Sequence, residues 1–503
     1  MMTGQLLNAL IWLPILGGIF VLRINDDAHS LTARILSLFI ILLSLVLCIP
    51  LWQNFDFIQP GMQFITDLNW VPLFGMHYSL GIDGLSLVLI ILSIFTNLIV
   101  VLVSWDSIRV RVGQYLAAFL IMQGLLVGVF AATDAILFYL FWEATLIPMY
   151  LIIGIWGSQN RVYAAIKFFL YTFLGSVLML LAFLYLGYQA GTFAIDTFYA
   201  VKLSMLVQSL IFFSFFLSFA IKIPMFPVHT WLPDAHTEAP AGGSIILAAI
   251  LLKLGAYGFI RFALPIVPDA CRMFAPLMIV LSLIAVVYIG FVAIVQQDMK
   301  RLIAYSSISH MGFVTLGAFG IFSLIANSSQ TTAALILEGA IVIMISHGFV
   351  SSAMFAGVGF IYDRLHTREI SKLGGLVNVM PNFAVLFMLF AMANAGLPGT
   401  SGFVGEFMII LASMKLSFWI AFWAATTLIL GAAYNLWMMK RVVFGKVLTS
   451  KIAEVKDLSC YELTAYILLA IMVLGMGIYP KPFVDSIHQS VKDTLILADK
   501  SKL

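Results

Sequence analysis

Residues 244–264 read SIILAAILLKLGAYGFIRFAL, a stretch that is long enough to cross a lipid bilayer and otherwise apolar around Lys253. Lys253 is the tenth of these residues. At a rise of about 1.5 Å per residue it lies roughly 15 Å deep, close to the midplane of the membrane. A lysine at this depth costs several kcal/mol unless it is paired, hydrated or deprotonated.

Other titratable side chains occupy comparable depths in other apolar segments of the sequence. They are Glu143, Lys222, His310, His347 and Glu406. Titratable groups inside a membrane are costly and commonly mark ion or proton pathways, so this row of residues predicts proton movement.

The composition excludes a soluble globular protein. Of 503 residues, 62% are hydrophobic and only 10% are charged, which predicts a polytopic membrane protein. The net charge of +3 is too small to indicate a nucleic-acid partner. Cys48, Cys271 and Cys460 are far apart and form no C-x-x-C pair, and no dinucleotide or ATP motif is present. Redox and nucleotide chemistry are therefore expected in other chains.

Apolar runs recur from end to end, and the first one has neither the basic start nor the cleavage site of a signal peptide. We expect an all-α polytopic fold with about fourteen transmembrane helices. Their expected positions are 5–22, 32–52, 82–104, 115–132, 134–156, 163–188, 205–240, 244–264, 273–297, 302–325, 331–361, 376–415, 417–443 and 460–480.

Two of these runs are too long for one straight span and contain internal proline. Pro224 and Pro227 interrupt 205–240, and the segment Gly396–Gly402, which includes Pro398, interrupts 376–415. Proline removes a helical hydrogen bond and clashes with the preceding turn, so both helices should be broken there. Broken helices in corresponding halves are typical of the ion site of a transporter.

The spacing of these features suggests an internal repeat. Pro224 and Pro398 are 174 residues apart, and Glu143 and His310 are 167 apart. We expect two five-helix inverted repeats, 115–264 (helices 4–8) and 273–443 (helices 9–13). Residues 1–114 would hold helices 1–3, and 444–503 the last transmembrane helix and a short tail.

The distribution of basic residues predicts the orientation, because cytoplasmic connections are enriched in Lys and Arg. The connection at 53–81 has no Lys or Arg, whereas the odd-numbered connections carry many. They are Arg23, Arg34, Arg109, Arg111, Arg161, Lys300, Arg301, Arg364, Arg368, Lys372, Lys440, Arg441, Lys446, Lys451 and Lys456. Both termini are therefore expected outside.

Lys222, just before the first proline break, is the natural partner of Glu143. The pair is either a static ion pair that fixes helix packing or a conditional pair that releases a proton when Glu143 moves away. Lys253 has no acidic neighbour in its own helix, and it is too deep to reach either surface easily. It is therefore expected to relay protons.

The remaining candidates lie on other segments. His310 and His347 are mid-helix and flanked by hydroxyl residues that can hold water, and of the two His310 is the stronger candidate. Glu406 follows the second break as an exit-side group, with a structural role as the alternative. The secondary candidates are His347 itself, His229 and Glu338. The segment HTWLPDAHTEAP (229–240) fits no standard zinc motif, so no metal site is expected.

Several of these segments together resemble a known family. They are FWEATLIPMYLIIGIWG, FAIKIPMFPVHTWLPDAHTEAPAGGSIILAAILLKLGAYGFIRF, AYSSISHMGF and GLPGTSGFVGEF. Over nearly the whole chain the sequence is similar to the proton-translocating, antiporter-like subunits of respiratory complex I. The resemblance is strongest to the M-subunit group, because the chain ends soon after its last span and carries Glu406 where other subunits typically have lysine.

The resemblance implies a proton-translocating role driven by electron transfer in other subunits. Glu143 and Lys222 would form the fifth- and seventh-helix ion pair, and Lys253 the central relay. His310 would be the connection and Glu406 the terminal group. This chain would bind no cofactor, and NADH, FMN, iron–sulfur clusters and quinone would belong to partner subunits.

The implied partners are the lipid bilayer, the neighbouring antiporter-like subunits and the lateral helix of the L subunit, with no nucleic acid. The implied location is the inner (plasma) membrane of a bacterium, with both termini periplasmic. The alternative function is that of a D-like subunit of a multisubunit cation/proton antiporter, driven by an ion gradient. We expect a hydrated axis through Lys222, Lys253, His310 and Glu406, in which water rather than direct hydrogen bonds bridges the gaps.

Overall fold

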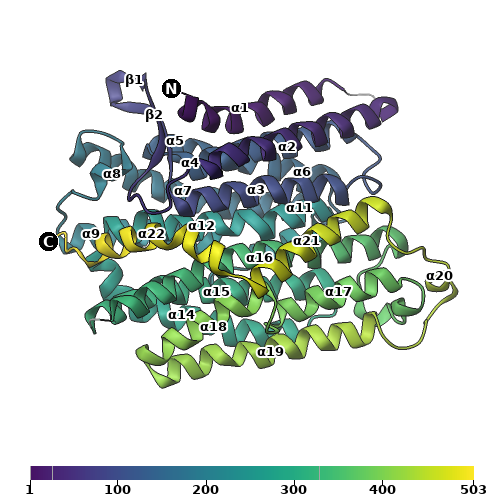
Figure 1. Cartoon of the computed structure of the whole chain (residues 1–503). Helices are drawn as coiled ribbons and strands as arrows, with labels where there is room; N and C mark the ends of the chain where they lie inside the picture. The colour runs from purple at the N-terminus through teal and green to yellow at the C-terminus, as the bar shows by residue number, and fades with distance from the viewer. Residues whose placement is uncertain (1, 25–26, 328) are drawn as a thin grey trace.

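The apolar runs fold as helices because backbone groups in lipid must find their hydrogen-bond partners within the segment itself. The computed structural model describes residues 2–24, 27–327 and 329–503. In Figure 1 most of the long helices lie along one common direction. Thirteen helices in these described ranges are long and apolar enough to cross a membrane. The predicted helical polytopic fold is therefore confirmed.

Ten spans are single uninterrupted helices that do not adjoin a predicted break. They are α1 (Met2–Leu22), α2 (Ser30–Gln53), α3 (Gly84–Val103), α4 (Val112–Ala131), α7 (Arg161–Ala190), α14 (Pro268–Ile294), α15 (Met299–Ala326), α16 (Gln330–Leu365), α19 (Phe418–Val442) and α21 (Cys460–Ile478). Short helices in the connections are η1 (Asp27–His29), η2 (Pro72–Phe74), α8 (Ile195–Phe198), η5 (Ile370–Lys372), η6 (Leu376–Asn378) and α20 (Ser450–Ala453).

The two predicted breaks are present. The first separates α9 (Met205–Lys222) from α10 (Trp231–Glu238), and Pro224 and Pro227 lie between them. The second separates α17 (Pro381–Asn394) from α18 (Ser401–Leu416). Each half of this second pair is too short to count as a span alone, and together they occupy the twelfth expected position, 376–415.

Two further interruptions were not predicted. The expected helix 134–156 is divided at Thr145 into α5 (Ala135–Ala144) and α6 (Leu146–Trp156). Pro148, which has no amide hydrogen to donate to the carbonyl of Ala144, explains this division. The expected helix 244–264 contains two wider π-helical turns. Its parts are α11 (Ala241–Ile246), η3 (Leu247–Leu251), α12 (Leu252–Gly258), η4 (Phe259–Ala263) and α13 (Leu264–Ile266).

The connection at 53–81, for which the sequence predicted no structure, contains an antiparallel hairpin. Strand β1 (Gln63–Val71) pairs with β2 (Met76–Ile82), and Gly75 in the turn adopts the left-handed conformation with φ +64°. Figure 1 shows this hairpin and both termini at the same end of the bundle, which we call the termini end.

The expected short tail is also structured, as helix α22 (Lys481–Asp499). Ile487, Val491, Thr494 and Ala498 recur at helical spacing on its buried face. This face packs against α3, α13 and α16. Helix α22 therefore covers part of the termini end.

Burial differs between the spans. Nearly all residues of the broken segment from α11 to α13 are buried, as are most residues of α3, α15 and α16, whereas only about a third of the residues in α1 and α2 are buried. The centre of the bundle is thus built from α3, α11–α13, α15 and α16. Titratable side chains on these segments lie furthest from solvent.

Helix α21 packs closely against the second break, and this contact generates a prediction about stability. A Cβ atom at Gly477 would overlap backbone atoms of Gly399 and Thr400, whereas a Cβ at Gly475 would meet nothing within 4 Å. We expect Gly477→Ala to lower the free energy of unfolding by about 1–3 kcal/mol. Gly475→Ala should leave it unchanged or slightly higher, because alanine favours helix.

The midpoint of thermal unfolding of the two purified variants measures this difference. Equal midpoints for Gly477→Ala and Gly475→Ala would show that α21 does not depend on close contact at the break.

Candidate functional site

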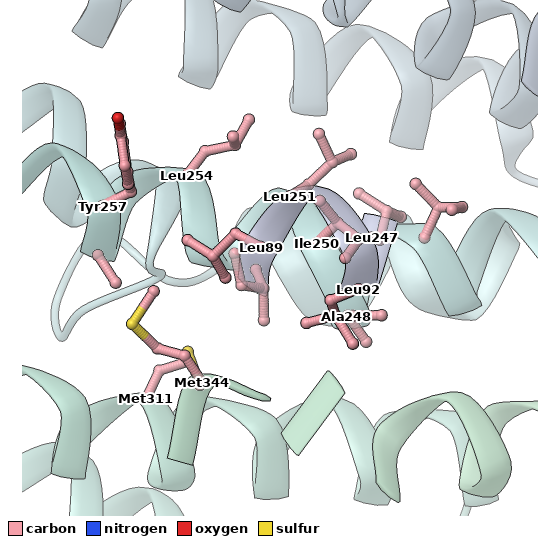
Figure 2. Close-up of a cluster of buried hydrophobic side chains, with 14 of the residues drawn as sticks. Leu89, Leu92, Leu247, Ala248, Ile250, Leu251, Leu254, Tyr257, Met311 and Met344 are labelled. Atoms are coloured by element: carbon pink, nitrogen blue, oxygen red, sulfur yellow. The ribbon is translucent and has the colours of Figure 1, made fainter. Parts of the chain in front are cut away.

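Lys253 lies at the centre of the site, on the short helix α12 between the two π-helical turns. Its side chain is completely buried. The ammonium Nζ donates a hydrogen bond to the carbonyl of Ala248 in η3 at 2.7 Å, and it lies 2.7 Å from Nδ1 of His347. Apolar side chains surround this region (Figure 2), so the contact is shielded from water.

Two histidines extend the contact towards the second break. The rings of His347, on α16, and His310, on α15, have centroids 5.6 Å apart and are tilted by 52°. Nδ1 of His310 lies 3.1 Å from Oε1 of Glu406 on α18. Lys253, His347, His310 and Glu406 thus form a continuous row, which we call the relay. All four side chains are buried.

A small cavity adjoins the relay. Its volume is about 10 Å³, close to the space that one water molecule requires, and His310, His347, Asn394 and Glu406 contribute to its lining. Among the described residues, Nε2 of His310 and Nε2 of His347 have no hydrogen-bond partner. Buried polar atoms of this kind are normally satisfied, so these two nitrogens can take part in proton exchange.

The second break positions Glu406. Gly396, in the break, has φ +76°, a conformation that favours glycine, and a Cβ there would come within 2.6 Å of Oε2 of Glu406. Gly405 allows a similarly close approach of α18 to α16 near Ile343. The glycines of this segment therefore let the Glu406 carboxylate reach His310.

The side chains of Glu143 and Lys222, predicted to pair, are close enough to interact electrostatically but do not form a direct hydrogen bond. Lys222 is buried at the end of α9, and its Nζ lies 5.1 Å from the centre of the Trp142 ring. Glu143, at the end of α5, interacts with the charge of Lys222 and with Ser176. Among the described residues, Lys222 Nζ and Glu143 Oε1 have no hydrogen-bond partner. The charged groups of the expected ion pair therefore interact across a gap and not through a hydrogen bond.

His236, on α10, is a further buried titratable residue that interacts with two buried lysines. Its ring is completely buried and stacks on Phe355 with centroids 4.4 Å apart, and both Lys253 and Lys300 act on its charge. Lys300 is buried and donates to the carbonyl of Ala239 at 2.6 Å. In the sequence, His236 stands out only as part of the segment 229–240, which fits no standard zinc motif. The described residues hold no cluster of three His, Cys, Asp or Glu suited to a metal ion.

The secondary candidates have different surroundings. His347 joins the relay directly, so it is more central than the sequence indicated. His229 is buried and stacks on Phe226, and no contact links it to the relay in the described part of the chain. Glu338 lies 2.5 Å from Nδ1 of His488 on α22, and its nine-residue distance from His347 amounts to roughly 13 Å along the helix. Glu338 therefore belongs to the termini end.

The expectation that water bridges every gap was wrong for two links. Lys253 meets His347 directly, and His310 meets Glu406 directly. His347 occupies the gap between Lys253 and His310, and the glycines of the second break let Glu406 reach His310. Spacing along the sequence reveals neither position.

Comparison with known proteins gives consistent matches. Residues 132–431 match the family model described as NADH:quinone oxidoreductase/Mrp antiporter, TM. The chain is 46% identical to NADH-quinone oxidoreductase subunit M of Rhodobacter capsulatus, over 97% of this chain and 96% of the relative. It is 44% identical to NADH-ubiquinone oxidoreductase chain 4 of Chondrus crispus, over 99% of each.

A solved structure has the same fold. It is a chain in the structure of respiratory complex I from Thermus thermophilus with bound NADH, which matches with a TM-score of 0.87 and 31% identity over 98% of this chain and 100% of that one. The family model covers more than half of the sequence, and the relatives match it almost from end to end. The chain therefore belongs to the NADH:quinone oxidoreductase/Mrp antiporter family of membrane proteins.

Proposed function

We propose that this chain is a proton-translocating membrane subunit of an NADH:quinone oxidoreductase, in which electron transfer occurs in other subunits. The observation that carries the proposal is the relay of Lys253, His347, His310 and Glu406. Four buried titratable side chains from four separate segments meet in one row, where each would otherwise be costly to bury. The relatives, named as subunits of NADH–quinone and NADH–ubiquinone oxidoreductases, support the redox-driven reading.

In the relay, a proton moves from one side chain to the next, and neighbouring side chains are not protonated at the same time. Lys253 and His347 are too close to be charged together in a buried site, so the pair holds one proton at a time. An imidazole accepts a proton on one nitrogen and releases one from the other. His347 can therefore take the proton from Lys253 and pass it towards His310, and Glu406 receives it at the end of the row.

The Glu143–Lys222 pair controls the entry of protons. The Lys222 ammonium has no hydrogen-bond partner among the described residues and lies against the Trp142 ring. Its charge is thus stabilised mainly by Glu143, and any movement of Glu143 changes its affinity for a proton. His236, which interacts electrostatically with both Lys253 and Lys300, is a further candidate for this route.

The same proposal includes the partner subunits of the chain, its place in the membrane and its internal repeats. NADH, FMN, the iron–sulfur clusters and quinone are bound by partner subunits. The membrane partners are the neighbouring antiporter-like subunits and the lateral helix of the L subunit. The chain lies in the plasma membrane of a bacterium with both termini periplasmic, and residues 115–264 and 273–443 are inverted repeats.

The alternative is a subunit of a multisubunit cation/proton antiporter, since the family description includes both classes. The two classes differ in their source of energy. Purification of the native complex from membranes distinguishes them: NADH oxidation coupled to proton release supports the oxidoreductase. Proton transport driven by a sodium or potassium gradient, with no NADH oxidation, would support the antiporter.

Lys253 provides the most direct test of a relay. Arginine keeps a positive charge but does not release its proton at accessible pH. We expect Lys253→Arg to reduce coupled proton transfer by at least about tenfold, as much as Lys253→Ala does. Proton release per NADH oxidised in membrane vesicles is the measurement. Full pumping by the arginine variant would show that Lys253 is only a fixed charge.

Glu143 tests the entry pair. Glu143→Ala should abolish most coupled pumping while the complex still assembles, because Lys222 then loses its nearby charge. Glu143→Asp should keep part of the activity. The measurements are the amount of assembled complex on a native gel and its rate of NADH-driven proton release. Unchanged pumping by a fully assembled Glu143→Ala complex contradicts a coupling role.

The position of Glu406 depends on Gly396, and Gly399 in the same break is a matched control. Both glycines have positive φ, +76° and +89°, but a Cβ at Gly399 meets nothing within 4 Å. Alanine at either position carries a backbone cost of about 1–2 kcal/mol. Only Gly396→Ala displaces the Glu406 carboxylate, so only this variant should lose most pumping at normal assembly. Equal pumping by the two variants would show that the position of the Glu406 carboxylate does not matter for proton transfer.

A further inference from the structure

An open cavity at the termini end reaches towards the centre of the bundle. Its volume is about 660 Å³, and we call it the vestibule. It lies between the β1–β2 hairpin, the start of α3, the start of α5, α13 and α22. Charged side chains at its wall include Asp83, Asp134, Arg261 and Asp493. None of these residues belongs to the relay or to the entry pair.

The inner wall of the vestibule is closed by an ion pair. Nη2 of Arg261 lies 2.7 Å from Oδ1 of Asp83, and both side chains are about nine-tenths buried. Burial alone would raise the pKa of the Asp83 carboxyl, but the charge of Arg261 and hydrogen bonds from Arg261 and Ser86 outweigh it and hold this pKa below its usual value. The pair is therefore ionised at neutral pH.

Tyr257 lies one helical turn from Arg261 and one turn from Lys253 on the same segment. Its hydroxyl donates to the carbonyl of Phe130 at 3.2 Å, accepts from Nε of Arg261 at 3.3 Å and lies 3.1 Å from Oγ of Ser86. Its ring packs edge-on against Phe130. Tyr257 thus connects the Arg261–Asp83 pair to the interior of the bundle.

Between Tyr257 and Lys253 the surroundings are apolar. Figure 2 shows Leu89, Met311 and Met344 beside the helix that carries Tyr257, and Leu254 on that helix, and all four are buried. An apolar layer without polar groups holds water poorly and blocks proton hopping. Beyond this layer, the Arg261–Asp83 ion pair and the hydrogen bond from Arg261 to the Tyr257 hydroxyl close the wall of the vestibule. The route between Lys253 and the vestibule is short, and it is closed in this structure.

We propose that Tyr257, Arg261 and Asp83 form a gate between Lys253 and the vestibule, and that the vestibule is the aqueous compartment with which Lys253 exchanges protons when the gate opens. This proposal rests on the proposed function, in which Lys253 is a relay group.

The π-helical turns provide a means of opening. Helix α12, which carries Lys253 and Tyr257, is bounded by η3 and η4. A π turn holds one more residue than an α turn, so its loss or gain shifts and rotates the helix beside it, and such turns are frequent at functional sites. A small movement of α12 would draw the Tyr257 hydroxyl away from Phe130 and Ser86 and part the apolar layer.

Proton leak through the resting complex tests the gate. The double variant Asp83→Asn/Arg261→Gln removes both charges together, which avoids leaving one buried and unpaired. Tyr257→Phe keeps the ring and removes only the hydroxyl, so it tests the gate with the least effect on folding. The assay is passive proton uptake by vesicles that contain the assembled complex, without NADH.

We expect either change to raise the leak at least about tenfold, which corresponds to removing a barrier of ~1.4 kcal/mol. Adding Lys253→Ala should abolish the increase, because the gate leads to that lysine. The matched control is Arg364→Gln/Glu462→Gln. It removes an ion pair of similar burial, with Nη2 and Oε2 2.6 Å apart, at the opposite end of the bundle. This control should leak no more than the parent.

Cysteine labelling provides an independent readout. Met344→Cys should react with a membrane-impermeant maleimide in the gate variants and not in the parent or the control. The gate is refuted if neither gate variant leaks or becomes labelled, or if their leak persists without Lys253, which would indicate loosened packing alone. The proposed function has its own test in the pumping of Lys253→Arg, so a failure of either proposal is distinguishable from a failure of the other.

Discussion

The contact between Lys253 and His347 is the constraint on which the rest of the structure depends. An ammonium group at the centre of a membrane protein must find partners or lose its charge. Here it has one carbonyl and one imidazole nitrogen, both at 2.7 Å, and a surrounding of apolar side chains. The π turn η3 supplies the carbonyl, α16 supplies the imidazole, and α3 supplies much of the apolar cover. The most buried segments of the bundle therefore converge on one nitrogen atom.

The broken helices extend this contact to other charges. Unwound backbone at 395–400 lets Glu406 lie beside Gly396 and reach His310, and the break after Lys222 leaves that lysine at the end of α9 near Glu143. Unbroken helices would keep these side chains on surfaces that face neighbouring helices or lipid. In this fold proline and glycine serve to bring titratable groups together, and the cost of burying each group is offset by its neighbour.

The sequence predicted the helices well, because about twenty apolar residues in a row have few alternatives in a membrane. It also predicted both breaks, since proline cannot donate a helical hydrogen bond. It missed the division at Thr145, the π turns beside Lys253, the β1–β2 hairpin and α22. These features depend on contacts between distant segments. Lys253, His310 and Glu406 were recognised by depth, whereas the central place of His347 and the burial of His236 follow from how α16 and α10 pack.

Protonation of His347 tests the central claim most directly. Infrared difference spectra of the complex, recorded with and without NADH and with isotope-labelled histidine, report changes in imidazole protonation. If Lys253 and His347 share one proton, turnover should give an imidazole signal that disappears in His347→Gln and also in Lys253→Ala, although that variant keeps every histidine. An unchanged histidine signal in an assembled Lys253→Ala complex would contradict the account.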